Sequence, residues 1–168
     1  MSGTPPAPIV RDLDQLAETI EALKAEGKTI VMTNGTFDLL HVGHLRSLED
    51  ARSRGDVLVV AVNSDASVRG YKGPNLPIQP EAERAELLAG LRCVDYVTIF
   101  DELTVDNVLL KLKPQIHAKG TEYDPATVPE GPTVRSYGGE IAIVGDPKAH
   151  STSWLIARIR GVEASKTS

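Results

Sequence analysis

The sequence predicts an α/β fold whose sheet has about five strands, most of them parallel. Three short apolar runs, at residues 29–33, 57–62 and 96–100, are rich in β-branched residues and do not alternate with polar positions. Continuous apolar strands are typical of a parallel sheet that helices cover on both faces. Helical segments between the runs supply the crossovers that parallel strands need. With right-handed crossovers, such units form a Rossmann-like, doubly wound domain that binds ligands at the carboxyl ends of its strands.

The remaining elements follow in order along the chain. Residues 12–26 are expected to form an amphipathic helix, because apolar residues recur there at three- and four-residue spacing and Gly27 follows as a stop signal. Gly120 and Gly139 bound a punctuated stretch that we expect to be one extended loop region. Further helices are expected at about residues 43–54, 80–91, 104–112 and 151–160, with short strands at 115–118 and 140–144.

A length of 168 residues favours one domain with a single core. We expect residues 11–162 to form that domain. Residues 1–10 contain three prolines and no basic segment followed by an apolar one, so a flexible leader is expected rather than a signal peptide. Residues 163–168 are expected to form a flexible tail.

Composition excludes several classes of function. The formal net charge is -5, and no cluster of basic residues provides the footprint of a nucleic-acid binder, so a polymeric nucleic acid is not an expected partner. No apolar run approaches the roughly 18 residues that a membrane span needs. Cys93 is the only cysteine, which excludes an internal disulfide and fits the reducing cytoplasm. We therefore expect a cytoplasmic protein that acts on small molecules.

The most informative segment is T-N-G-T-F-D-L-L-H-V-G-H at residues 33–44, between the first strand and a helix. Its three-residue spacing places His41 and His44 on one side of the first helical turn, where backbone N–H groups and the helix dipole favour an anion. Gly43 permits close approach of a bulky anion. Two alternatives are a pair of capping or solvent-facing histidines and a metal site. No cysteine cluster or acidic pair accompanies the histidines, so no metal site is predicted.

This segment resembles the G-x-F-D-x-x-H-x-G-H signature of the cytidylyltransferase-like nucleotidyltransferases, which holds nucleotide phosphates. Over residues 29–160 the chain is similar to the bacterial heptose-1-phosphate adenylyltransferase branch. The segments that carry this similarity are V-N-S-D at 62–65, K-G at 72–73, E-R at 83–84, V-D-Y-V at 94–97, K-G-T-E-Y at 119–123 and S-T-S at 151–153. The resemblance implies an enzyme that joins ATP to D-glycero-β-D-manno-heptose 1-phosphate and releases pyrophosphate, for the lipopolysaccharide inner core.

The resemblance also implies roles for individual residues. His41, His44 and Lys72 are expected to be catalytic. Nucleotide contacts are expected from Thr33, Asn34, Gly35, Thr36, Phe37, Gly43, Lys119, Gly120, Glu122, Ser151, Thr152 and Ser153. Asn63, Asp65 and Arg84 are expected to bind the sugar phosphate, whereas Asp38 is expected to hold the loop. Mg²⁺ is expected to accompany ATP and to bridge its phosphates, and the chain is expected to form a homo-oligomer, a dimer.

Three positions depart from that branch. Leu76 stands where an arginine is usual, Glu122 replaces an aspartate, and His150 precedes the S-T-S segment where an arginine is common. Two alternative functions stay open. One is a related cytidylyltransferase acting on glycerol phosphate or another sugar phosphate, and the other is a nucleotide sensor without turnover. A dehydrogenase is disfavoured because no G-x-G-x-x-G follows the first strand.

Overall fold

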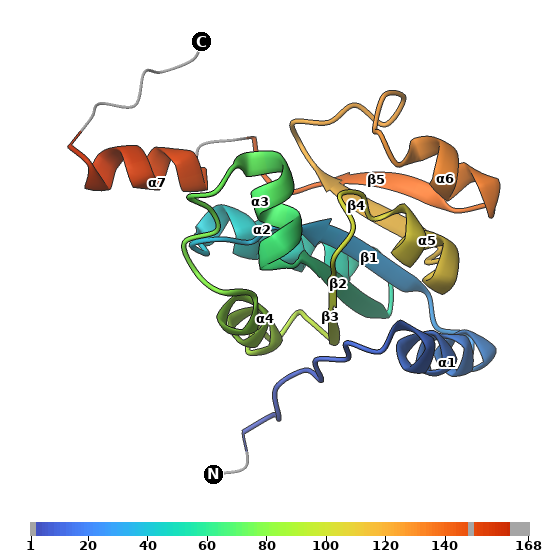
Figure 1. Cartoon of the computed structure of the whole chain (residues 1–168). Coiled ribbons are helices and arrows are strands. Elements are labelled where there is room, and N and C mark those ends of the chain that lie inside the picture. The colour runs from blue at the N-terminus through green and yellow to red at the C-terminus, as the bar shows by residue number, and fades with distance from the viewer. Residues whose placement is uncertain (1–2, 148–149, 162–168) are drawn as a thin grey trace.

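A computed structural model of the chain describes residues 3–147 and 150–161, and a five-stranded parallel sheet lies at its centre (Figure 1). The strands are β1 (Ile30–Gly35), β2 (Val57–Asn63), β3 (Tyr96–Phe100), β4 (Ile116–Gly120) and β5 (Glu140–Val144). Their spatial order is β3-β2-β1-β4-β5, and every pairing is parallel. The order reverses between β1 and β4, which is the point where open α/β sheets bind ligands. The predicted fold class is therefore confirmed.

Both faces of the sheet are buried, as the continuous apolar runs predict. All seven residues of β2 are buried. Because successive side chains of a strand point to opposite faces, Val57 and Val59 join one core cluster while Leu58 and Val60 join the other. Helices at residues 13–25, 106–112 and 131–136 pack against the first cluster, and helices at residues 42–53 and 81–89 pack against the second.

The helices of the described residues agree with most of the expected spans. They are α1 (Leu13–Ala25), α2 (Val42–Ser53), α3 (Asp65–Lys72), α4 (Glu81–Ala89), α5 (Asp106–Leu112), α6 (Gly131–Ser136) and α7 (Thr152–Ile159). Asp12 begins α1, because its carboxylate accepts hydrogen bonds from the amides of Asp14 and Gln15. The sequence did not predict α3, and the loop expected between Gly120 and Gly139 is wrong at α6. Both helices are short and contain glycine, so their local signal is weak, and α6 forms where Val134 packs into the core.

Residues 7–10 run along β3, although the sequence analysis expected them to belong to a flexible leader. The Ala7 amide donates to the Ala89 carbonyl at 2.8 Å, and the Val10 amide donates to the Val97 carbonyl at 2.8 Å. The Val97 amide in turn donates to the Pro8 carbonyl at 3.0 Å. This segment covers an otherwise exposed sheet edge. The predicted tail at 163–168 lies outside the described residues.

Across residues 3–147 and 150–161, none of the helices combines the length and the apolar character needed to cross a bilayer.

Candidate active site

A cavity of about 500 Å³ opens at the carboxyl ends of β1 and β4. Its wall contains every residue for which the sequence predicts catalysis or nucleotide contact, from Thr33 at the end of β1 to Ser153 in α7. These residues come from four separate segments: the end of β1 with the start of α2, the end of α3, the end of β4, and the start of α7. The topology of the sheet therefore brings together groups that lie up to 120 positions apart in the chain.

His41 and His44 lie at the start of α2 and face this cavity. The Gly43 amide donates to His41 Nδ1 at 3.1 Å, and the His41 amide donates to His44 Nδ1 at 3.3 Å. The two rings stack with their centroids 3.9 Å apart. Because each Nδ1 accepts a hydrogen bond, the proton of each neutral ring lies on Nε2. The histidines thus cap the helix and also present N–H donors of the kind that bind phosphate.

Asp38 holds the loop that carries these histidines. Its carboxylate accepts hydrogen bonds from the amides of Ile78 at 2.6 Å and Gln79 at 2.9 Å. On either side of it, Phe37 and Leu39 have φ values of 52° and 48°, a left-handed conformation that costs energy in residues other than glycine. The carboxylate therefore ties a strained turn to the segment before α4, which agrees with a structural role for Asp38.

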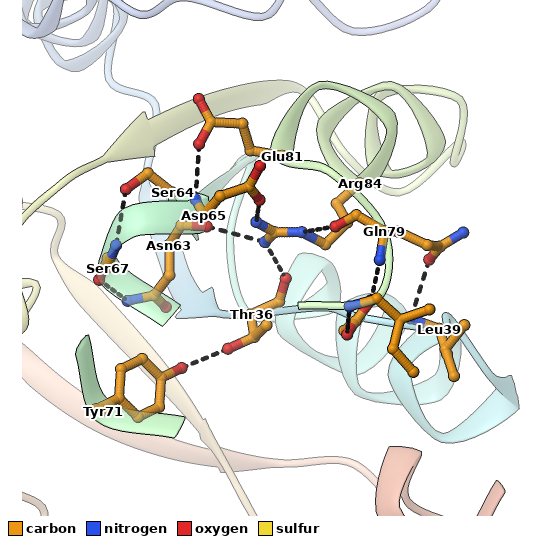
Figure 2. Close-up of polar contacts among 12 residues, drawn as sticks. Thr36, Leu39, Asn63, Ser64, Asp65, Ser67, Tyr71, Gln79, Glu81 and Arg84 are labelled. Atoms are coloured by element: carbon orange, nitrogen blue, oxygen red, sulfur yellow. Dashed lines mark hydrogen bonds and ion pairs between the residues drawn. The ribbon is translucent and has the colours of Figure 1, made fainter. Parts of the chain in front are cut away.

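Arg84 occupies a different place from the one the sequence predicts (Figure 2). Its side chain is 0% exposed and does not reach the cavity wall. Nη1 donates to the carbonyls of Thr36 at 2.6 Å and Asn63 at 2.9 Å, and Nε donates to the Gln79 carbonyl at 2.9 Å. Nη2 pairs with the Asp65 carboxylate at 2.8 Å. With its donors directed at protein oxygens, Arg84 joins the ends of β1 and β2 and has no access to a substrate.

Asn63 and Asp65, the other predicted sugar-phosphate contacts, belong to the same buried network. The Asn63 side-chain amide donates to the Ser67 hydroxyl at 3.0 Å. The Asp65 amide donates to Glu81 at 2.7 Å, and its carboxylate is the partner of Arg84. Neither residue lines the cavity. Asn63 ends β2 and Asp65 begins α3, and a sequence does not show which polar groups a buried arginine will engage. Their contact with the sugar phosphate stays a prediction.

Two lysines bring positive charge to the cavity. Lys72, the last residue of α3, lies with its ammonium 5.6 Å from the centre of the Tyr71 ring. The Tyr71 hydroxyl is hydrogen-bonded to the Thr36 hydroxyl. Lys119, near the end of β4, is 3.1 Å from Glu130 and 4.5 Å from the centre of the Tyr123 ring. Both lysines can approach an anion in the cavity.

A second helix begins at the cavity wall. Ser151 caps α7, since its hydroxyl accepts a hydrogen bond from the Trp154 amide at 3.1 Å. The Thr152 hydroxyl donates to the Asp38 carbonyl at 2.7 Å, which fixes this helix to the histidine loop. His150 lies beside it, 6.4 Å from the His41 ring. The N-termini of α2 and α7 therefore both face the cavity, and both favour negative charge there.

The model of the cytidylyltransferase-like family matches residues 32–148, which include the histidine loop and the Lys119 segment. The chain belongs to this cytidylyltransferase-like family.

The relatives of this cytidylyltransferase-like chain include bifunctional proteins named HldE. It is 51% identical over 150 residues to HldE of Geobacter metallireducens, covering 89% of this chain and 31% of that protein. It is 49% identical over 151 residues to HldE of Geotalea uraniireducens, covering 90% of this chain and 31% of that protein. The chain thus spans about a third of the length of these relatives. Among solved structures, a lipopolysaccharide core biosynthesis protein from Thermoplasma volcanium aligns with a TM-score of 0.63 and 28% identity, covering 73% of this chain and 100% of that one.

The sequence analysis missed several residues that line the cavity of this cytidylyltransferase-like domain. They are Arg46, Ser47, Tyr71, Thr121, Asp146 and Pro147. Helical spacing could have indicated Arg46 and Ser47, which follow Gly43 by three and four positions. The loop residues have no such signal. Arg46 pairs with Asp146 at 2.9 Å across 100 positions of sequence, a contact that only the parallel pairing of the strands creates. Leu76, which replaces the usual arginine, is half-buried and does not line the cavity.

Proposed function

We propose that the chain is an adenylyltransferase that joins ATP to D-glycero-β-D-manno-heptose 1-phosphate, forming ADP-heptose and pyrophosphate. The observation that carries this proposal is the single cavity that unites the stacked His41–His44 pair, two lysines and two helix N-termini. Such a set suits a polyanion with several phosphate groups. The similarity to HldE proteins supports the choice of substrate within the family.

The reaction needs positioning and charge stabilisation rather than a covalent enzyme intermediate. An oxygen of the sugar phosphate attacks the α-phosphorus of ATP, and a new phosphorus–oxygen bond forms. The bond from the α-phosphorus to the oxygen that bridges to the β-phosphate breaks, and its electron pair leaves with pyrophosphate. We assign His41 and His44 to the oxygens of the α-phosphate, where negative charge develops. Lys72 and Lys119 neutralise the phosphates, and the start of α7 receives the β- and γ-phosphates.

Mg²⁺ belongs to this proposal as part of the substrate, Mg²⁺–ATP. Within the described ranges, no group of three or more His, Cys, Asp or Glu side chains could hold a metal ion. The Asp38 carboxylate is engaged by two backbone amides. The described residues of the cavity therefore fit a Mg²⁺ ion that is held by phosphate oxygens and water. Mg²⁺ is commonly bound in this way in nucleotide sites. The ion would offset the charge of the triphosphate.

We also propose that the enzyme works in the cytoplasm as a homodimer. The single cysteine supports a reducing compartment. Helix α7 contains no buried residue, and Ile159 at its end is 79% exposed, which leaves an apolar surface that a second copy could cover. The mass of the purified protein in light scattering tests the oligomeric state.

Product analysis tests the reaction. The purified chain is incubated with ATP or CTP and a panel that includes heptose 1-phosphate, other sugar 1-phosphates and glycerol 3-phosphate, and the products are identified by mass spectrometry. We expect ADP-heptose and pyrophosphate, with kcat/KM for ATP at least about tenfold above that for CTP, a difference of about 1.4 kcal/mol. Equal or better use of CTP would instead support the cytidylyltransferase alternative. Nucleotide binding without pyrophosphate release would support the sensor.

A further inference from the structure

Lys119 is almost enclosed although it lines the cavity. Its side chain is 7% exposed, with Nζ 3.1 Å from Glu130 Oε1 and 3.5 Å from Asn34 Oδ1. The Tyr123 ring lies on another side, with its centre 4.5 Å from Nζ. Burying an ammonium costs free energy unless an opposite charge compensates it. Lys119 therefore needs a nearby carboxylate.

Glu130 supplies that carboxylate from a segment that is otherwise exposed. Most of residues 121–129 are exposed, yet the Glu130 side chain is only 13% exposed and turns inward just before α6. Its second oxygen, Oε2, is buried and has no partner among the described protein groups. An acidic side chain in an exposed loop ordinarily faces water. Its burial against Lys119 thus needs an explanation other than solubility.

The titratable groups around the pair leave Lys119 as the counter-charge of Glu130. His117, two residues before Lys119 on β4, is 0% exposed, and neither of its ring nitrogens has a partner among the described residues. Burial and the Lys119 ammonium lower the pKa of His117 to about 4, so its ring is neutral near pH 7. Asp106 of α5 carries a negative charge and accepts a hydrogen bond from the Thr133 hydroxyl at 2.5 Å.

We propose that Glu130 is a positioning residue for the transfer reaction, which holds the Lys119 ammonium directed along the cavity wall. An ammonium has three N–H donors. Two of them are directed at Glu130 and Asn34, which leaves the third for a phosphate oxygen in the cavity. Glu130 acts through Lys119 and does not itself touch the substrate. This inference rests on the proposed function.

A pair that is only structural would behave differently from a positioning pair. Loss of a structural ion pair lowers the melting temperature but leaves the kinetics of the folded fraction unchanged. Loss of a positioning carboxylate also changes those kinetics, because the ammonium is no longer held in place. The kinetic constants of the folded fraction, and their partial rescue by E130D, therefore separate the two roles.

The experiment compares E130Q, E130D, K119M and the double variant E130Q/K119M with the wild-type protein. The matched control is E21Q, which removes the charge from another Glu–Lys pair at 3.0 Å, between Lys24 and a Glu21 side chain that is 65% exposed. For each protein, kcat and KM for ATP are measured at equal folded fraction, the dissociation constant for ATP is measured by calorimetry, and the melting temperature is recorded.

We expect E130Q to lower kcat/KM for ATP at least about tenfold, because the Lys119 ammonium is no longer held in place. E130D retains a carboxylate and should lose less kcat/KM than E130Q. The double variant should be no worse than K119M alone, because both changes remove the same group from the cavity. E21Q should match the wild type.

Wild-type kinetics in folded E130Q, or a full additive loss in the double variant, would overturn the role of Glu130 while leaving the proposed function intact. If E130Q does not fold, a kcat/KM for E130D equal to that of the wild type would overturn it, and a reduced kcat/KM at equal folded fraction would support it. If the wild-type protein binds ATP without turnover, only the proposed function fails, and the ratio of dissociation constants between E130Q and wild type then tests Glu130. Absence of both binding and turnover overturns both proposals.

Discussion

At the scale of the residue, the two signature histidines combine an observed structural role with the chemical role that we propose for them. His41 and His44 use Nδ1 to accept backbone hydrogen bonds at the start of α2. That arrangement directs the proton of each neutral ring to Nε2. Because the ring orientation is fixed before any substrate enters, the donors require little reorganisation during the reaction.

The substitution H44A tests this role. We expect kcat to fall by at least about a hundredfold, because loss of one preorganised donor to a developing charge typically costs about 10²–10³ in rate. Stability should fall by only about 1 kcal/mol, the typical value of a helix cap. Steady-state kinetics and circular dichroism are the measurements. Near-normal turnover would show that the histidine serves only the helix.

At the scale of the element, the start of α2 depends on the small size of Gly43. An added Cβ there would lie 2.9 Å from Cε1 and Nδ1 of His41. The Gly43 amide is also the donor to that same Nδ1. The first turn of the helix therefore leaves no room for a side chain without moving the His41 ring.

We expect G43A to lower kcat by about ten- to a hundredfold, since displacement of a catalytic group by about 1 Å can cost that much. The matched control is G90A at the end of α4, where an added Cβ would lie 3.5 Å from the Leu87 carbonyl, an ordinary contact. G90A should keep wild-type activity. The kinetic constants of G43A and G90A are compared at equal folded fraction. Equal activities would contradict the prediction that a Cβ added at Gly43 displaces the His41 ring.

Arg84 connects secondary-structure elements to one another and does not contact the substrate. The substitution R84M tests that connection. The change leaves the carbonyls of Thr36, Asn63 and Gln79 and the Asp65 carboxylate without their partner. Removing one member of a buried pair costs about 3–5 kcal/mol, and in a chain of this size each 1 kcal/mol lowers Tm by about 2–4 °C.

The control for R84M is R11M, which breaks a 3.0 Å pair with Glu81 in which the Arg11 side chain is 57% exposed. Exposed pairs contribute about 0–1 kcal/mol, so its Tm should barely change. Thermal unfolding followed by circular dichroism distinguishes them. A Tm for R84M close to that of R11M would mean that the network does not hold the strand ends.

At the scale of the whole molecule, the sheet places a titratable group inside the core. His117 lies on β4 and is fully buried beneath the cavity-lining Lys119. Its pKa falls from 6.5 to about 4, chiefly because burial disfavours the charged ring and further because the Lys119 ammonium repels a second positive charge. The stability of the entire domain therefore depends on pH through this one side chain.

The sign follows from proton binding. Between pH 6.5 and about 4 the unfolded chain protonates His117 while the folded chain does not, so stability is lost as the pH falls through this range. The loss attributable to His117 is up to about 3 kcal/mol. We expect urea unfolding of H117F to have a shallower dependence on pH than the wild type over this range. If the free energies of unfolding of H117F and the wild type change equally with pH, this pH dependence does not come from His117.

The strands and the histidine loop could be predicted because their signals are local. The run at residues 57–62 is apolar at every position, short and rich in valine, which favours a strand buried on both faces. The residues His41 and His44 lie three positions apart at a helix start, which by itself brings them together. The short helices α3 and α6 contain few such signals, and the contact of residues 7–10 with β3 depends on a distant strand.

The sequence by itself therefore determined the fold class, the helix that follows His41 and the histidine segment that lines the cavity. Only the tertiary structure decided that Arg84 is buried as a support and that Glu130 faces Lys119. The physical reason is the distance along the chain over which each interaction acts. Hydrophobic periodicity and capping act between neighbours in the chain, whereas the partner of a buried charge is chosen by whichever polar groups the folded backbone brings within hydrogen-bond distance.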